Sequence, residues 1–201
     1  MSLMLLLQTS NGVPMLGFAR DDQIVFDTSA QPEWEGSRDY RAMVDAGLKA
    51  LGAQLSDLTA ITVDIGPGGM GVTRTGASFA NALGFALGLP VLAIPAFEML
   101  GAQVAKGDTP VVLLRKAARP YVHFGIYRDS QLAHYEHLTR DQALSQIKEL
   151  DKFTLAGNVP LEGVEPPLTN AATLQTMLTV ARSKPAPAPQ ARAYPLVEGL
   201  E

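Results

Sequence analysis

The sequence predicts a two-lobed α/β protein in which each lobe holds a mixed β-sheet flanked by helices. Short apolar or alternating runs give way to segments of helical period, and the order of three strands, helix, strand, helix occurs once in each half. The halves meet at the turn-rich stretch Lys106-Gly107-Asp108. We therefore expect an N-terminal lobe over residues 1–106, a smaller C-terminal lobe over 107–183 and a proline-rich tail over 184–201.

The composition limits the function classes. The 201 residues are 47% hydrophobic and 18% charged, as in an ordinary globular protein that is long enough to bury a core. The formal net charge is -4, so a nucleic-acid role would need a local basic patch or a basic partner, and we expect no direct nucleic-acid binding. The absence of cysteine excludes disulfides and thiolate chemistry. The apolar run at residues 5–7 is too short to span a membrane, so we expect a cytoplasmic protein.

The first half begins with a predicted antiparallel meander followed by a helix. Apolar or alternating runs at residues 5–7, 13–20 and 23–28 are separated by residues typical of turns. Apolar residues at a spacing of three to four then predict an amphipathic helix, with Ser37 as its N-cap and Gly52 as its stop.

The rest of the first half alternates strands and helices. The β-branched run Ile61–Ile65 predicts a buried strand, and the glycines and proline at 66–69 end it. A small-residue, apolar segment from about Thr73 to Leu87 predicts a helix, Val91–Ile94 a strand, and the stretch from Pro95 to Ala105 a helix with proline in its first turn.

The second half repeats this order on a smaller scale. Its predicted strands are residues 111–114, 121–127, 132–137 and 153–156, and its predicted helices are residues 139–150 and 171–181. Thr139 and Gln142 have the spacing of a capping box. Prolines 185, 187 and 189 then predict an extended tail that cannot join the middle of a sheet.

One segment carries a family resemblance. The run Ile65-Gly66-Pro67-Gly68-Gly69-Met70-Gly71-Val72-Thr73-Arg74-Thr75-Gly76 leads into an alanine- and leucine-rich stretch. It resembles the strand-loop-helix of the TsaB (YeaZ) family, whose usual form is Gly-x-Gly-Pro-Gly-Ser-Phe-Thr-Gly-x-Arg-x-Gly. The opening strand also ends Gln8-Thr9-Ser10 where that family has Asp-Thr-Ser. Gly69-Met70-Gly71 replaces Ser-Phe-Thr, and the second half keeps only the strand pattern, so the resemblance is to a divergent member.

The resemblance implies a fold and a function. The fold is the duplicated actin-like ATPase (RNase H-like) fold. The function is that of a non-catalytic subunit that docks on a TsaD-like threonylcarbamoyltransferase and supports the formation of N6-threonylcarbamoyladenosine in tRNA. A TsaE-like ATPase is a further implied partner, and a homodimer is implied when the TsaD-like subunit is absent.

The implied interface lies on the predicted helices at 38–51 and 74–87. The second of these carries small residues around most of its circumference, which suits close packing on a sheet and on another helix. The candidate interface residues are Tyr40, Met43, Val44, Gly47, Arg74, Ala77, Ser78 and Asn81. Two alternatives stay open: an enzyme of the same fold, either ATP-dependent kinase-like or metallopeptidase-like, and a homodimeric relative with another partner.

The glycine-rich loop has two interpretations. Gly66, Gly68, Gly69 and Gly71 could cradle a phosphate, because glycine lets backbone N–H groups approach an anion. The simpler interpretation is that they end a buried strand and let the next helix pack closely, since the loop lacks the lysine and serine of a P-loop. We favour the second and expect no cofactor in the chain itself, with ATP or ADP only at an interface shared with a partner.

No side chains form a recognisable catalytic or metal-binding set. Gln8 stands where nucleotide-hydrolysing relatives use a carboxylate, and it cannot supply a charged metal ligand. His134 and His137 fall in a predicted strand, where a spacing of three puts them on opposite faces. Asp64 and Glu98 are isolated carboxylates. We therefore expect no catalytic residue and no metal site.

Overall fold

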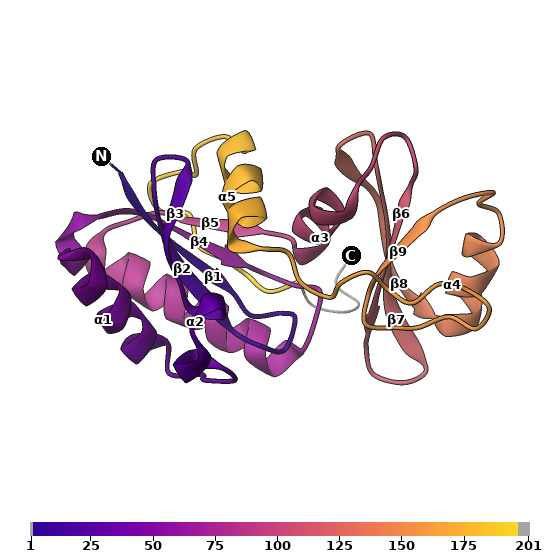
Figure 1. The fold of residues 1–201 in the computed structure, drawn as a ribbon, viewed down its shortest axis with the longest axis horizontal. Helices are drawn as coiled ribbons and strands as arrows, with labels where there is room; N and C mark the ends of the chain where they lie inside the picture. The colour runs from indigo at the N-terminus through magenta and orange to yellow at the C-terminus, as the bar shows by residue number, and fades with distance from the viewer. Residues whose placement is uncertain (1, 197–201) are drawn as a thin grey trace.

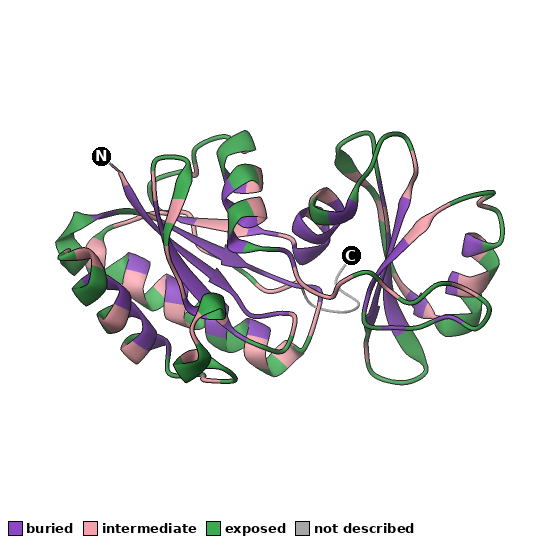
Figure 2. Cartoon of the chain, in the orientation of Figure 1, coloured by how far each residue is buried: buried purple, intermediate pink, exposed green. Residues whose placement is uncertain are grey.

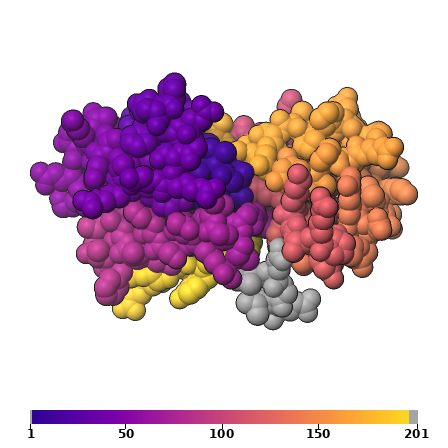
Figure 3. Space-filling view, turned by 90° about the horizontal axis from the view of Figure 1, so that it is seen from below, coloured from indigo at the N-terminus to yellow at the C-terminus, as the bar shows by residue number. Residues whose placement is uncertain are grey.

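The computed structural model describes residues 2–196, which form two lobes side by side along the long axis of the molecule (Figures 1 and 3). The first lobe contains a five-stranded sheet of order β3-β2-β1-β4-β5. Its strands are β1 (Leu3–Gln8), β2 (Met15–Arg20), β3 (Gln23–Asp27), β4 (Leu58–Asp64) and β5 (Val91–Ile94). Strand β2 is antiparallel to β1 and to β3, while β4 is parallel to β1 and to β5, so the predicted meander and mixed sheet are confirmed.

Helices cover both faces of this sheet. Helices α1 (Tyr40–Leu51) and α2 (Met70–Leu87) lie on one face, and α5 (Leu174–Ser183) lies on the other (Figures 1 and 2). Strand β1 is buried on both sides: its odd-numbered leucines pack with α1 and α2, whereas Met4 and Leu6 pack with α5. A continuous apolar strand is therefore the centre of the first lobe.

Three helix starts differ from the prediction, and one is that of α5, which begins at Leu174 and not at residue 171. The N-cap of α1 is Asp39 and not Ser37, because the Asp39 carboxylate accepts a hydrogen bond from the backbone N–H of Ala42. Helix α2 starts at Met70, before the predicted Thr73, and it has no side-chain cap at Gly69. The predicted stop at Gly52 is confirmed, since this glycine has left-handed backbone angles at the C-cap.

The second lobe contains a four-stranded sheet of order β8-β7-β6-β9. Its strands are β6 (Val111–Lys116), β7 (Tyr121–Arg128), β8 (Gln131–Thr139) and β9 (Thr154–Gly157), and its helix α4 (Arg140–Ile147) begins at the predicted capping box of Thr139 and Gln142. Strand β9 is parallel to β6, and β7 is antiparallel to both of its neighbours. Single 3-10 turns at Thr28–Ala30, Pro32–Trp34 and Leu55–Asp57 complete the elements.

Two helices pack across the predicted division of the chain. Helix α3 (Ala96–Val104) places Phe97, Leu100 and Val104 against the second sheet, while Ala96 and Met99 contact the first lobe. In the opposite direction, α5 packs on the first sheet although it follows the second one in sequence. The predicted lobe boundaries at residues 106 and 183 stay a prediction. The crossing of α3 and α5 between the halves joins the two lobes through apolar contacts.

The described part of the tail runs along the first lobe (Figure 3). The carbonyl of Ala191 accepts the N–H of Val91 at 3.1 Å, and the N–H of Leu196 donates to the carbonyl of Ile65 at 2.8 Å. The first bond joins the tail to the edge strand β5, and the second joins it to the residue that follows β4. The remainder of the predicted proline-rich tail, residues 197–201, lies outside the described residues.

The substitution Met177→Ala tests the packing of α5 on the first lobe. Met177 is fully buried among residues of the first sheet, so its loss leaves a cavity and should lower the free energy of unfolding by about 2–5 kcal/mol. Urea denaturation measures the change. Thr179→Ala, on the exposed side of the same helix, should change it by no more than about 0.5 kcal/mol. Equal effects of the two substitutions would contradict the packing.

Candidate functional site

The candidate site lies where strand ends of the two lobes meet. Strands β1 and β4 are parallel and end side by side at Gln8 and Asp64, and the C-terminal end of β6 approaches them through Arg115. Ligands of open α/β sheets usually bind at the carboxyl ends of parallel strands, so this is the place to look for chemistry.

Asp64 holds the two strand ends of the first lobe together. Its carboxylate is fully buried, and one oxygen accepts the backbone N–H groups of Thr9 and Ser10 at 2.7 and 2.9 Å. The other oxygen accepts the N–H of Gly66 at 3.0 Å. Three backbone donors satisfy a buried charge. Asp64 therefore has a structural role that its isolation in the sequence does not reveal.

Arg115 joins this region to the second lobe. Its guanidinium is 1% exposed, and Nη1 donates to Ser10 Oγ at 2.6 Å and to the Pro67 carbonyl at 2.7 Å, while Nη2 donates to the Asn170 carbonyl at 2.6 Å. Burial lowers the pKa of Arg115 to about 10, and the charge of Asp64 opposes this shift, so the group is cationic at neutral pH. We call Arg115, Asp64, Ser10, Pro67 and Asn170 the interlobe network.

The interlobe network was not predicted from the sequence. No local signal in the sequence distinguishes a buried arginine from an exposed one at a strand end. Its partners come from three segments far apart in the chain, since Ser10, Pro67 and Asn170 lie on different connections.

Gln8 is a buried structural residue at the end of β1. It is 1% exposed, and its side-chain amide donates to the carbonyl of Ala172 at 2.9 Å, just before α5. The amide thus ties the end of β1 to the segment that returns from the second lobe. A neutral side chain committed to this bond supplies no charge for a metal-bound nucleotide.

The glycine-rich loop is shaped by close packing. A Cβ atom on Gly68 would lie 2.1 Å from the Ser10 carbonyl oxygen, and one on Gly76 would lie 2.7 Å from Thr9 Oγ1. Gly66 is buried with a φ of +91, whereas Gly69 and Gly71 are exposed near the start of α2. The Pro67 carbonyl inside the loop is bonded to Arg115. Close packing thus accounts for glycine at positions 68 and 76, and the interpretation of the loop as a whole stays a prediction.

Two of the three histidines, His123 and His137, lie side by side, which the sequence did not predict. His134 and His137 lie on opposite faces of β8 as expected, but the strand register sets His123 of β7 directly opposite His137 and next to Arg115. His123 is 2% exposed, and burial, with smaller effects of His137 and Arg115, lowers its pKa to about 4. Within residues 2–196, no three histidine, aspartate or glutamate side chains are grouped to hold a metal ion.

The predicted interface residues divide into two sets. Five of them face the core of the first lobe, namely Tyr40, Met43, Val44, Gly47 and Ala77. Burial raises the pKa of the Tyr40 hydroxyl, and its ring packs against Phe79 with centroids 5.4 Å apart. A partner could not touch these five buried residues without unpacking the lobe. Their assignment to an interface stays a prediction. The burial of these residues argues against it.

The other three predicted interface residues lie further out on α2. Arg74 and Ser78 are exposed. Asn81 is half-buried, and its side-chain amide exchanges two hydrogen bonds of 2.8 Å with the backbone of Ala193 in the tail. Of the eight predicted residues, only Arg74 and Ser78 have side chains that are exposed to a partner.

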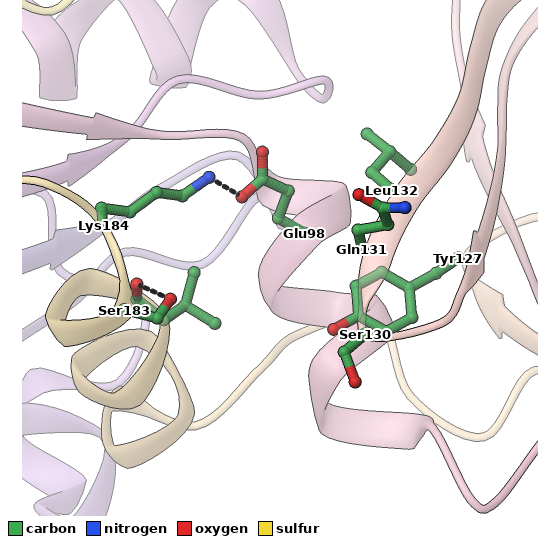
Figure 4. Close-up of a pocket in the computed structure, with 8 residues that line it drawn as sticks. Glu98, Tyr127, Ser130, Gln131, Leu132, Ser183 and Lys184 are labelled. Carbon is green, nitrogen blue, oxygen red and sulfur yellow. Dashed lines mark hydrogen bonds and ion pairs between the residues drawn. The ribbon is translucent and has the colours of Figure 1, made fainter.

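Away from the strand ends, a pocket of about 310 Å³ lies between α3, the end of α5 and the β7–β8 hairpin (Figure 4). Lys184 forms an ion pair with Glu98 on one side, and Tyr127, Ser130 and Gln131 of the hairpin lie across from it. Burial, with a smaller effect of Glu98, raises the pKa of Tyr127. The carboxylate of Glu98 is thus bound to the residue that follows α5, as part of the junction between the lobes.

The architecture defines a class: a two-lobed α/β protein with the duplicated actin-like ATPase fold, as the family resemblance implied. A family model described as TsaD, tRNA N6-adenosine threonylcarbamoyltransferase, matches residues 37–165, which is more than half of the chain. The chain belongs to this family, and the predicted TsaB (YeaZ) kinship is confirmed.

Solved structures share the whole fold. YeaZ from Pseudomonas aeruginosa superposes with a TM-score of 0.66 at 20% identity and covers 91% of this chain and 92% of its own. An uncharacterized protein with similarity to peptidase YeaZ from the same organism gives 0.71 at 19% identity, covering 98% and 99%. At these identities the likeness shows the fold alone.

Curated relatives match over shorter stretches. An uncharacterized protein of Mycobacterium tuberculosis is 33% identical over 108 residues, which are 54% of this chain and 47% of the relative. A tRNA N6-adenosine threonylcarbamoyltransferase of Aromatoleum aromaticum is 48% identical over 56 residues, which are 28% of this chain and 16% of the relative. The alignment with the mycobacterial protein thus spans about half of that relative's length. Within residues 2–196, no helix has the length and apolar character needed to cross a membrane.

The substitution Arg115→Ala tests the interlobe network. It removes three hydrogen bonds and leaves the charge of Asp64 without its cationic neighbour, so the free energy of unfolding should fall by about 3–5 kcal/mol. Denaturant unfolding followed by circular dichroism measures this. Lys116→Ala, at the exposed next position, should have an effect within about 0.5 kcal/mol, and a similar loss in both variants would rule out a special role for Arg115.

Proposed function

We propose that this chain is a non-catalytic TsaB-like subunit that docks on a TsaD-like threonylcarbamoyltransferase and supports the formation of N6-threonylcarbamoyladenosine in tRNA. Membership of the family supports the pathway. The interlobe network is the observation that carries the accessory role. At the strand ends where a catalytic centre of this fold would lie, Asp64 and Arg115 are already committed to backbone and side-chain partners within the chain.

The docking surface in this proposal is the exposed stripe of α2. It consists of Gly71, Arg74, Thr75, Ser78, Ala82, Phe85 and Ala86, which we call the α2 docking face. Phe85 is 79% exposed, and most of its neighbours on the stripe have small side chains. A large exposed ring among small residues favours close approach by another helix. We propose that a TsaD-like subunit covers this face in the complex, and that a second copy of the chain covers it in isolation.

Nucleotide has a limited place in the proposal. Gln8 is neutral and bonded to Ala172, and Arg115 reaches across to the glycine-rich loop. These contacts favour a chain that does not need ATP or ADP for its own fold or action. Nucleotide would then bind only at an interface shared with a partner, such as the TsaD-like subunit or a TsaE-like ATPase, and the complex would act in the cytoplasm.

The rival enzymes make demands that the described residues do not meet. A kinase-like member needs a metal-organising carboxylate at the end of β1, where this chain has Gln8. A metallopeptidase-like member needs ligands converging on one ion, whereas His134 lies on the opposite face of the sheet from His123 and His137. A homodimeric relative with another partner would use the same α2 docking face.

The substitution Ser78→Arg tests the docking face. A long cation in the middle of the small-residue stripe should prevent close helix packing and weaken binding to the TsaD-like subunit of the same organism at least about tenfold. Size-exclusion co-elution and the stimulation of threonylcarbamoyl transfer are the measurements. Thr179→Arg, an equivalent change on α5, should bind and stimulate as the unmodified chain does. If the unmodified chain neither co-elutes nor stimulates, the proposed function is wrong.

Calorimetry with Mg-ATP separates the accessory role from the kinase-like alternative. Because the strand-end groups are committed within the chain, we expect no binding of Mg-ATP to the isolated chain at a dissociation constant below about 1 mM. A micromolar dissociation constant for Mg-ATP, together with loss of binding when Gln8 at the end of β1 is replaced in Gln8→Ala, would instead favour an enzyme of the same fold.

A further inference from the structure

One segment of the second lobe is basic, although the chain as a whole is acidic. Residues 109–128 contain four lysines and arginines and no acidic residue, although the whole chain has a net charge of -4. The flanking acids are Asp108 and Asp129. Both lie at the end of the sheet where β6 begins and β7 ends, which is opposite to the end where Lys116 lies. The charge is therefore polarised along the sheet.

Three exposed cations gather at one end of this sheet. Lys116 ends β6, Arg119 lies in the turn to β7, and Arg140 begins α4 directly after β8. The backbone N–H of Arg140 donates to the Pro120 carbonyl at 3.3 Å, which brings the start of α4 to the β6–β7 turn. Asp141 is the acid that adjoins this group in sequence. We call Lys116, Arg119, Arg140 and Tyr121 the basic end of the second sheet.

An aromatic residue, Tyr121, begins β7 directly after the turn that holds Arg119. Tyr121 is 43% exposed at the start of β7, and its ring stacks on that of His137 with centroids 4.9 Å apart and planes at 27°. Stacking on a neighbour holds the tyrosine ring in place while part of it stays exposed. A positioned aromatic ring beside cations is the combination on which bases of single-stranded nucleic acids stack while the cations contact the phosphates.

The basic end is close to the proposed docking face. Arg115, which precedes Lys116, is bonded to the Pro67 carbonyl, and Pro67 lies three residues before the start of α2. Arg74, which is exposed in the first turns of α2, adds a further positive charge on this side of the first lobe. A partner bound to α2 would therefore lie near the basic end, and an RNA held by that partner could reach both.

We propose that the basic end of the second sheet binds an unpaired segment of RNA, with Tyr121 stacking on a base and Lys116, Arg119 and Arg140 contacting phosphates. The choice of RNA as the polyanion rests on the proposed function. This inference revises the expectation of no direct nucleic-acid binding, which followed from the net charge alone. The local basic patch that such binding requires forms only when β6, β7 and α4 come together.

Fluorescence anisotropy with a labelled unpaired RNA oligonucleotide tests the charges, using the chain alone and its complex with the TsaD-like subunit. The triple variant K116Q/R119Q/R140Q should bind about tenfold or more weakly. The slope of log affinity against log salt should fall by about 2, since each phosphate contact to a single strand contributes about 0.7. The matched control K106Q/R128Q/K152Q neutralises three exposed cations at the other end of the sheet and should keep its affinity and most of its slope.

A second pair of variants tests the stacking. Tyr121→Ala should weaken RNA binding about five- to fiftyfold with the salt slope unchanged, whereas Tyr121→Phe keeps the ring and should bind as the unmodified chain does. Thermal unfolding of every variant checks that the fold is kept. Equal binding of a fully paired duplex and the unpaired strand would overturn the role of Tyr121.

Two outcomes would overturn the RNA surface as a whole. One is equal loss of affinity in the two triple variants, which would show non-specific attraction. The other is that the chain alone does not bind RNA and that the complex with the TsaD-like subunit binds RNA equally well with the unmodified chain and with K116Q/R119Q/R140Q. Co-elution with the TsaD-like subunit is measured separately. If the complex forms and RNA binding is unaffected, only the RNA surface is wrong, and if no complex forms, the proposed function is wrong.

Discussion

The buried guanidinium of Arg115 is the interaction on which the arrangement of the two lobes depends. A charge that is 1% exposed is tolerated only when hydrogen bonds replace water, and Arg115 finds these bonds on three separate connections of the chain. Two of its acceptors belong to the first lobe and the third precedes α5. The bonds therefore fix the second sheet against the strand ends of the first, where Asp64 gathers the adjoining backbone N–H groups.

The exchange of helices gives this network its apolar support. Helix α3 leaves the first lobe and packs on the second sheet, and α5 returns to cover the first sheet. Each lobe thus lacks a complete core without a segment from the other half of the sequence. Gln8 strengthens the return crossing through its bond to Ala172, just before α5. Polar and apolar contacts together fill the interior of the strand-end region. Our two proposals therefore place function on the surface, at the α2 docking face and at the basic end of the second sheet.

Much of the fold could be predicted because it follows from local patterns. The apolar run of β2, the helical spacing of α1, the stop at Gly52 and the capping box at Thr139 all depend on residues within a few positions of each other. The start of α1 was misplaced because Ser37 and Asp39 are both good capping residues, and only the backbone path decides which side chain reaches the N–H of Ala42. The pairing of His123 with His137 depends on strand register, which has no local signal.

The sequence by itself determined the order of elements, the apolar character of β1 and the family to which the chain belongs, because these depend on local residue patterns and on a contiguous glycine-rich motif. The tertiary structure decided which residues act together. Arg115 meets Ser10 across 105 positions of sequence, and Arg140 joins the turn at Pro120 only through the pairing of β7 with β8. Burial and local charge are properties of neighbours in space. For this reason, five predicted interface residues lie in the core, while a cationic surface exists on an acidic chain.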